Sequence, residues 1–245
     1  MGHPALAQQS HRPWPLPTRP WLLRQTWHDL LFLHWPIAAD RLRPVVPAKL
    51  SIDEHSGSAW VAVTPFWMSG IGVRRWPTPP FASRFDELNV RTYVRLGDRP
   101  GVWFFSLDAG SLLGVWGAHL LYGLPYVFAR MRHHRANGDI AYFAKRNRAV
   151  QFVARYRPTG SPRQSQPGSL EHWLTERYCL YAPGASGRLF RAEIHHAPWS
   201  LQPASAEIER NDMLAANGIP LSTAPELLHF AERLEVVVWP RERVA

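Results

Sequence analysis

The stretch FDELNVRTYV, Phe85–Val94, alternates polar and apolar side chains over most of its length. Successive residues of a β-strand point to opposite faces, so the segment predicts a strand with one polar face. The residues on that face are Glu87, Asn89, Arg91 and Tyr93. A carboxylate, a carboxamide and a guanidinium in one row are costly to bury unless they pair or bind something. The row therefore forms either the wall of a cavity or plain exposed surface, and alternation alone does not decide.

A second strand is expected at GVWFFSLDA, Gly101–Ala109, after the turn-forming residues GDRPG. Two β-rich runs joined by a short turn segment indicate a hairpin. Strict alternation would place Ser106 and Asp108 on one face, and a suitable register would bring that face beside Arg91. Two carboxylates in a dry pocket raise the pKa of at least one of them, which favours Glu87 or Asp108 as an acid or base. A structural ion pair between arginine and carboxylate is the alternative.

The composition is that of a globular protein. The 245 residues are 46% hydrophobic and 19% charged. We expect residues 1–20, which contain five prolines, to form a disordered tail, and residues 21–245 to form a single domain. The 12 tryptophans could line a cavity, although a bulky core is the simpler explanation for them.

The formal net charge is +9, and the 28 basic residues include only two lysines, Lys49 and Lys145. The arginines are mostly scattered, whereas nucleic-acid binders concentrate their charge in runs or stripes. The single cysteine, Cys179, excludes an intrachain disulfide and agrees with a reducing cytosol, so a cytoplasmic location is expected. The first 20 residues lack the apolar core of a signal peptide, and no window approaches about 18 consecutive apolar residues, so no membrane association is expected.

The remaining elements are predicted from local patterns. Strands are expected at 140–146, 149–157, 189–199 and 229–240, and short helices at 38–50 and 169–178. Residues 111–131 suggest a helix or helical hairpin, and residues 206–218 a helix, whereas residues 21–35 fit either a helix or a strand. Many short strands with few helices favour a mainly β (α+β) domain, either an antiparallel barrel or a sandwich, with helical decoration.

Several motifs occur in a fixed order along the chain. They are HWP (His34–Pro36), AWVAVTPFWM (Ala59–Met68), ELNVRTYV (Glu87–Val94), GVWFFSLDA (Gly101–Ala109), LPYVFARM (Leu124–Met131), GSLEHWLTERYCLY (Gly168–Tyr181) and HHAPWSL (His195–Leu201). With these motifs the chain resembles the YqjF-like family, also called domain of unknown function 2071. That family is similar to the acetoacetate decarboxylase superfamily, whose members share a cone-like β-barrel around a pocket. The resemblance implies an antiparallel acetoacetate decarboxylase-like β-barrel with a few flanking helices, and places the polar face of Phe85–Val94 in its lumen.

The resemblance also bears on the chemistry. Decarboxylases of the superfamily attack their substrate through a lysine Schiff base, and that lysine follows a Tyr-Pro pair directly. Here Leu124-Pro125-Tyr126 is the best match and places Tyr126 where the amine would stand. Lys49 and Lys145 do not replace it, so we do not expect Schiff-base decarboxylation. Glu87 corresponds to the acidic residue that the superfamily carries on its pocket-lining strand.

We therefore expect a pocket that binds or converts a small molecule bearing a carbonyl or carboxylate group. Glu87, Asp108 and Tyr126 are the candidate catalytic residues, with lyase- or hydrolase-like acid/base chemistry if the protein is an enzyme. The candidate binding residues are Asn89, Arg91, Ser106, His34 and Trp35.

Two other functions stay open, namely a ligand-binding module without catalysis and, more weakly, a basic nucleic-acid-binding protein. No cofactor is expected. No metal is expected either, because the histidine pairs 133–134 and 195–196 are adjacent and no HExxH spacing occurs. A homo-oligomer is compatible with the aromatic content, but no spacing in the sequence specifies one.

Overall fold

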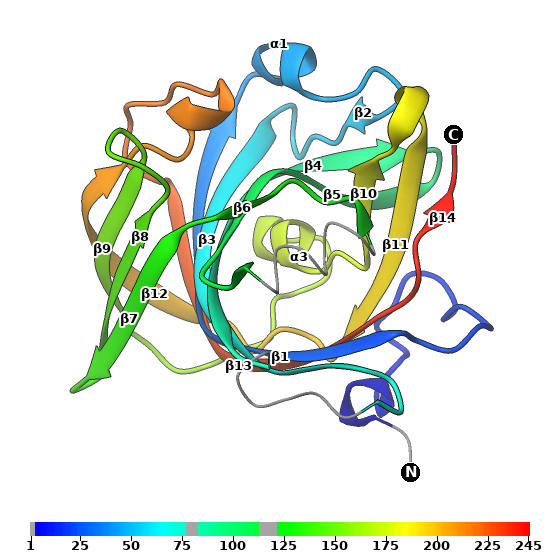
Figure 1. Cartoon of the computed structure of the whole chain (residues 1–245), viewed down its shortest axis with the longest axis horizontal. Coiled ribbons are helices and arrows are strands. Elements are labelled where there is room, and N and C mark those ends of the chain that lie inside the picture. The colour runs from blue at the N-terminus through cyan, green and yellow to red at the C-terminus, as the bar shows by residue number, and fades with distance from the viewer. Residues whose placement is uncertain (1–2, 77–82, 113–121) are drawn as a thin grey trace.

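The computed structural model describes residues 3–76, 83–112 and 122–245, and most of these lie in β-strands (Figure 1). The strands are β1 (Leu23–Ile37), β2 (Ser51–Ile52), β3 (Ala59–Val73), β4 (Phe85–Leu96), β5 (Arg99–Ala109), β6 (Tyr126–Phe128), β7 (Arg130–Ala136), β8 (Asp139–Lys145), β9 (Gln151–Pro158), β10 (Cys179–Pro183), β11 (Leu189–His196), β12 (Gln202–Asn211), β13 (Leu227–Val238) and β14 (Glu242–Arg243). The helices are α1 (Ala39–Leu42) and α3 (Leu170–Thr175), with 3-10 turns η1 (Pro4–Leu6), η2 (Arg43–Val45), η4 (Ala185–Gly187) and η5 (Ala215–Asn217). The expected mainly β content is thus observed.

The central feature is a sheet that curls around an interior. Its strands follow the order β11-β10-β5-β4-β3-β1-β13, and β11 also hydrogen-bonds to β13. Figure 1 looks down into this curled sheet, with α3 in the centre of the view. The pairs β5/β10 and β5/β6 are parallel, so the sheet is mixed and the prediction of a purely antiparallel arrangement is wrong. β10 returns to β5 only after the long excursion through β7–β9 and α3, and such a crossover permits parallel pairing.

A second layer determines which face of β4 turns inward. Strands β12, β9, β8 and β7 extend the sheet beyond β13 (Figure 1). Their inner side chains, such as Phe152, pack in one core cluster with Leu88 and Val90 of β4. The Tyr142 hydroxyl donates to the backbone carbonyl of Glu87 at 2.8 Å. Fully burying a Leu or Val side chain stabilises a fold by about 1.5–3 kcal/mol, so the apolar face of β4 lies under the second layer and its polar face looks into the interior.

Strand β5 contains a β-bulge at Phe105. In the β4/β5 pairing Arg91 lies opposite Phe104, whereas Val90 lies opposite Ser106. Phe105 is therefore an extra residue without a partner on β4, and the alternation of β5 reverses beyond it. Every side chain after Phe105 points to the face opposite to that predicted by strict alternation.

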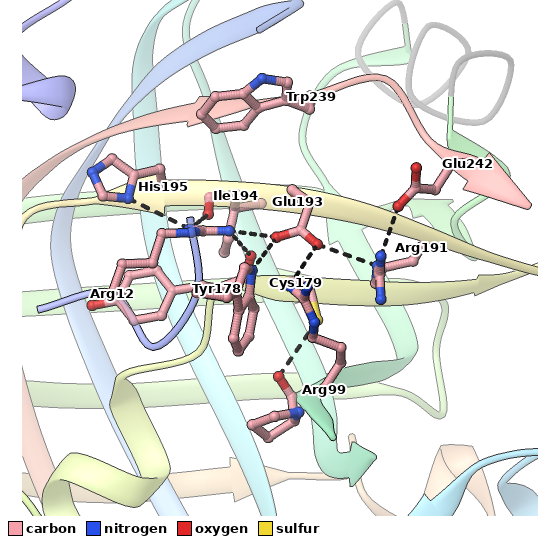
Figure 2. Close-up of polar contacts among 12 residues, drawn as sticks. Arg12, Arg99, Tyr178, Cys179, Arg191, Glu193, Ile194, His195, Trp239 and Glu242 are labelled. Carbon is pink, nitrogen blue, oxygen red and sulfur yellow. Dashed lines mark hydrogen bonds and ion pairs between the residues drawn. The ribbon is translucent and has the colours of Figure 1, made fainter. Parts of the chain in front are cut away.

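Residues 3–20, which we call the N-terminal strap, were expected to be disordered but lie against β11 and β13. Figure 2 shows the buried Arg12 side chain reaching β11, where it forms an ion pair with Glu193 and donates to the backbone carbonyl of Ile194 at 2.6 Å. The Trp14 indole donates to the same Glu193 carboxylate at 2.8 Å. A proline-rich composition suggests disorder, but composition does not predict long-range contacts. Here the buried Arg12 pairs with a carboxylate more than a hundred residues away in the sequence.

Other local predictions have mixed outcomes. Strands β8, β9, β11 and β13 and helix α3 confirm their predictions, and the Ser169 hydroxyl caps α3 by accepting from the His172 amide at 3.2 Å. The helix predicted at 206–218 is wrong, because residues 206–211 belong to β12, which pairs with β9, and the remainder is helical only at η5. The helix predicted over 111–131 is wrong at Tyr126–Phe128, which forms β6, while its residues 113–121 lie outside the described part of the chain. Within the described ranges, no helix is long and apolar enough to cross a membrane.

Candidate binding cavity

The curled sheet surrounds a partly open cavity of about 240 Å³. Its wall is contributed by β1, β3, β4, β5, β6, β10, β11 and β13 and by residues at and after the end of α3, and most of it is apolar. The polar side chains on the wall include Thr64, Glu87, Asn89, Arg91, Tyr126 and Arg177. Pockets for small molecules typically measure about 300–1,000 Å³, so this cavity lies just below that range.

Strand β4 supplies three polar residues to this wall. Glu87, Asn89 and Arg91 line the cavity, because Leu88 and Val90 between them pack under the second layer. Side chains two apart on a strand share a face, so the three groups stand in one row. The structure thus brings together three of the residues singled out from the sequence, and Tyr126 joins them from β6.

Glu87 is the acidic residue of the cavity wall. Its side chain is 3% exposed, and Oε2 accepts a hydrogen bond from the Tyr126 hydroxyl at 2.9 Å. Burial raises the pKa of Glu87 to about 8, although hydrogen bonds from Tyr126 and Asn89 lower it in part. Burial likewise raises the pKa of Tyr126 well above its usual value. At neutral pH the pair is therefore a protonated carboxylic acid hydrogen-bonded to a neutral phenol.

Arg91 carries a positive charge that no carboxylate balances. It forms no ion pair with any described residue, and the residues outside the described ranges include no Asp or Glu. Its guanidinium carbon lies 5.2 Å from the ring centre of Phe32 and 5.9 Å from that of Tyr93. Its Nε is buried and has no hydrogen-bond partner in the described part of the chain. Arg91 also shares a side-chain hydrogen bond with Tyr93, which is a neutral partner. A buried charge is unfavourable unless an opposite charge pairs with it, so Arg91 is suited to an anionic ligand.

Ser106 and Asp108 lie on the other face of β5, outside the cavity. Asp108 is fully buried and accepts two hydrogen bonds from Arg146, at 2.5 and 3.0 Å. The Ser106 hydroxyl accepts from the Asn217 side chain at 3.0 Å. This differs from the predicted polar patch beside Arg91, because the bulge at Phe105 reverses the alternation before both residues. Asp108 instead forms a structural ion pair with Arg146, which is the alternative that the sequence left open.

His34 and Trp35 also lie away from the cavity wall. The His34 Nε2 atom is 2.7 Å from the Tyr93 hydroxyl, and its ring stacks on Phe32 at 5.6 Å. Burial lowers the pKa of His34 well below its usual value, so the imidazole is neutral. Trp35 points to the outer core and donates its indole N–H to the Thr223 carbonyl at 2.9 Å. His34 therefore supports the wall from behind, whereas Trp35 belongs to the opposite face of β1.

Several polar and aromatic wall residues were not singled out from the sequence. Among them are Thr175 at the end of α3, Arg177 just after it, His196 at the end of β11 and Trp199 beyond it. Their signal was present in the motifs Gly168–Tyr181 and His195–Leu201, but neither motif shows an alternating pattern that would mark a polar wall.

No lysine lines the cavity. Lys49 and Lys145 are the only lysines of the chain; the Lys49 ammonium donates to the Gly187 carbonyl on the surface, at 3.1 Å, and Lys145 lies on β8 in the second layer. Tyr126 thus stands on the wall without an amine beside it. In the described ranges, no group of three or more His, Cys, Asp or Glu residues is arranged to hold a metal ion.

The architecture matches solved structures of one fold. Acetoacetate decarboxylase from Legionella pneumophila superposes with a TM-score of 0.64 at 14% identity, over 96% of this chain and 93% of that one. The enduracididine biosynthesis enzyme MppR complexed with pyruvate gives a TM-score of 0.66 at 11% identity, over 93% and 91% of the two chains. An acetoacetate decarboxylase-like enzyme from Sphingomonas wittichii RW1 gives 0.62 at 14% identity, over 97% and 99%. The chain has an acetoacetate decarboxylase-like fold.

The sequence comparisons identify the family within that fold. The chain belongs to the DUF2071 family, described as an uncharacterized conserved protein, whose profile matches residues 24–235. It is 43% identical over 222 residues to the uncharacterized protein YqjF of Bacillus subtilis (strain 168), and the match spans 90% of this chain and 91% of the relative. The resemblance noted from the motifs is confirmed.

Proposed function

We propose that the chain binds a small carboxylate in its central cavity and that Glu87 and Tyr126 act on it as an acid/base pair. The observation that carries the proposal is that a buried acid and a buried cation stand on the same face of β4. Glu87 is a buried acid held in its protonated form, and Arg91 is a buried cation without a carboxylate partner among the described residues. Perturbed titratable groups that converge in a cavity are typical of functional sites.

The Glu87–Tyr126 pair is suited to moving one proton. A carboxylic acid with a pKa of about 8 holds its proton at neutral pH and can donate it to a developing carbanion or carbonyl oxygen. The Tyr126 hydroxyl, which donates to Oε2, fixes the orientation of the carboxyl group. Lyase- or hydrolase-like acid/base chemistry is therefore favoured over a covalent amine mechanism. The solved MppR complex holds pyruvate, itself a small carboxylate, which is consistent with the proposed ligand class.

The test of binding uses Arg91→Gln and a matched control, Arg157→Gln, at an exposed arginine of β9. Calorimetric titration with pyruvate and other small carboxylates at pH 7 should give at least a tenfold loss of affinity in Arg91→Gln only. Equal affinity in wild type and Arg91→Gln would exclude Arg91 as the anion site.

Binding without turnover is the second candidate, favoured by the lack of a lysine on the cavity wall. Glu87→Gln separates the two candidates, because it keeps the shape of the side chain and removes its titratable proton. An enzyme should retain ligand affinity in this variant and lose turnover of the same ligand. Turnover that is unchanged would remove Glu87 from the mechanism.

A further inference from the structure

Arg177 is held rigidly at one side of the cavity. Its Nη1 donates to Asp53 at 2.7 Å, and its Nε donates to the Trp173 carbonyl at 2.7 Å. The guanidinium carbon also lies 4.3 Å from the ring centre of Trp173 and 5.1 Å from that of Tyr93. A planar guanidinium stacked on aromatic rings and paired on one edge has little freedom to reorient. Its remaining edge therefore points in a fixed direction.

That remaining edge has no hydrogen-bond partner. The residue is 5% exposed, it lines the cavity, and its Nη2 is buried without a partner in the described part of the chain. Leaving a buried donor unsatisfied costs about 1–3 kcal/mol, and more for a charged group. Other buried polar atoms of wall residues have no partner in the described part of the chain either, namely Trp27 Nε1, Arg91 Nε, the hydroxyls of Thr64 and Tyr122, and Asn89 Oδ1. Of these atoms only Asn89 Oδ1 is purely an acceptor, so the cavity presents mainly donors that await acceptor atoms.

The two arginines differ in their charge balance. Asp53 pairs with the buried Arg177 at 2.7 Å and also, at 3.3 Å, with Arg95, whose half-exposed charge is solvated by water. Arg91 has no acidic partner in the described ranges. Glu87 is protonated at neutral pH, so it does not balance the charge of Arg91. Burial lowers the pKa of His196, so this side chain adds no positive charge to the wall. A site with one net positive charge prefers a ligand with one negative charge, because a second buried anion would stay unpaired.

We infer that Arg177 is a second ligand-binding residue, and that the ligand is a monocarboxylate with an additional uncharged oxygen acceptor. The carboxylate binds at Arg91, and a carbonyl, ester, amide or hydroxyl oxygen accepts a hydrogen bond from Arg177 Nη2. The inference rests on the proposed function, since it places the carboxylate at Arg91. It adds a specificity determinant that rejects both simple fatty acids and dicarboxylates.

The experiment compares four probes with the same five-carbon chain. They are pentanoate, 2-oxopentanoate, 4-oxopentanoate and pentanedioate, titrated calorimetrically into the full chain at pH 7. A hydrogen bond from a charged donor corresponds to a roughly tenfold to hundredfold gain in affinity, so at least one oxo acid should bind that much more tightly than pentanoate. Pentanedioate should bind more weakly than the preferred oxo acid.

Variants of Arg177 then assign the effect. Arg177→Lys keeps a charge for Asp53 but lacks Nη2, and the double variant Arg177→Met with Asp53→Asn removes the whole pair. Both should lose the preference for the oxo acid over pentanoate. Circular dichroism and thermal melting identify any variant that fails to fold.

The outcomes separate the two proposals. If the oxo acids and pentanoate bind wild type equally, or if the preference persists in a folded Arg177 variant, the inference about Arg177 is overturned while the carboxylate site stands. If none of the probes binds wild type, or if binding ignores Arg91→Gln, the proposed function fails and the inference fails with it.

Discussion

Glu87 should make the protein less stable as the pH rises, and Glu87→Gln should remove that dependence. The carboxyl group is buried at the cavity wall, where burial raises its pKa from 4.5 to about 8. A group whose folded-state pKa is raised holds its proton in the native state at pH values where the unfolded chain has released it. Unfolding then releases a proton, so the free energy of unfolding falls with increasing pH between the two pKa values.

The magnitude follows from the two pKa values, 4.5 and about 8. Integrating the linkage relation from pH 5 to pH 9 gives a loss of about 4 kcal/mol in the free energy of unfolding for this group alone. That is a large part of the roughly 5–15 kcal/mol that holds a typical domain folded. Tyr126→Phe should enlarge the effect, because the hydrogen bond from Tyr126 lowers the pKa of Glu87.

The assay is urea unfolding followed by tryptophan fluorescence at pH 5, 7 and 9, for wild type and Glu87→Gln. Both proteins contain the same histidines, so the contribution of histidine titration cancels in the difference between their free energies of unfolding. The stability of the variant relative to wild type should increase steadily from pH 5 to pH 9. Identical pH profiles for the two proteins would refute the assignment of a protonated Glu87 to the native state.

Three further predictions concern contacts outside the cavity. Arg12→Met removes the most buried of the arginines that pair with Glu193, and Arg191 and Arg99 remain, so the loss should be that of hydrogen bonds to a charged group, about 2 kcal/mol; urea unfolding should show this loss, and limited proteolysis should then cut the N-terminal strap first. Asp108→Asn should lower the free energy of unfolding by about 3 kcal/mol, because Arg146 loses its charged partner. It should leave pyruvate affinity unchanged in the same calorimetric assay. Cys179 is fully buried and burial raises its pKa to about 12, so it should react with Ellman's reagent only after unfolding; rapid reaction of the native protein would contradict this placement.

The inward row on β4 could be predicted from sequence because it depends on a local rule. Alternation places Glu87, Asn89 and Arg91 on one face of a strand, and the resemblance to a barrel family turns that face inward. The structure agrees, and it supplies the physical reason, which is the second layer that covers the opposite face. The same rule gave the wrong face for Ser106 and Asp108 on the next strand, because of the bulge at Phe105. A bulge depends on how the neighbouring layers pack, and FFS offers no local signal for an extra residue.

Arg177 shows a different limit of sequence reasoning. It lies 90 positions after Glu87 in the chain, beyond a six-residue helix, and only the tertiary fold brings it to the same cavity. The misassigned segment 206–218 fails for a related reason, because AEIERN has the composition of a helix while pairing with β9 keeps it extended. In both cases contacts between residues far apart in the sequence determine the structure.

The bulge at Phe105 decides which side chains the far end of β5 presents to the cavity. Deleting Phe105 would remove the extra residue, and Ser106 would still lie opposite Val90 with its side chain outside the cavity. A regular strand of unchanged length would instead turn Ser106 and Asp108 into the cavity and turn Leu107 out of it. The same side chains can therefore form an apolar wall or a wall with a hydroxyl and a carboxylate, depending only on whether this one residue is accommodated as a bulge.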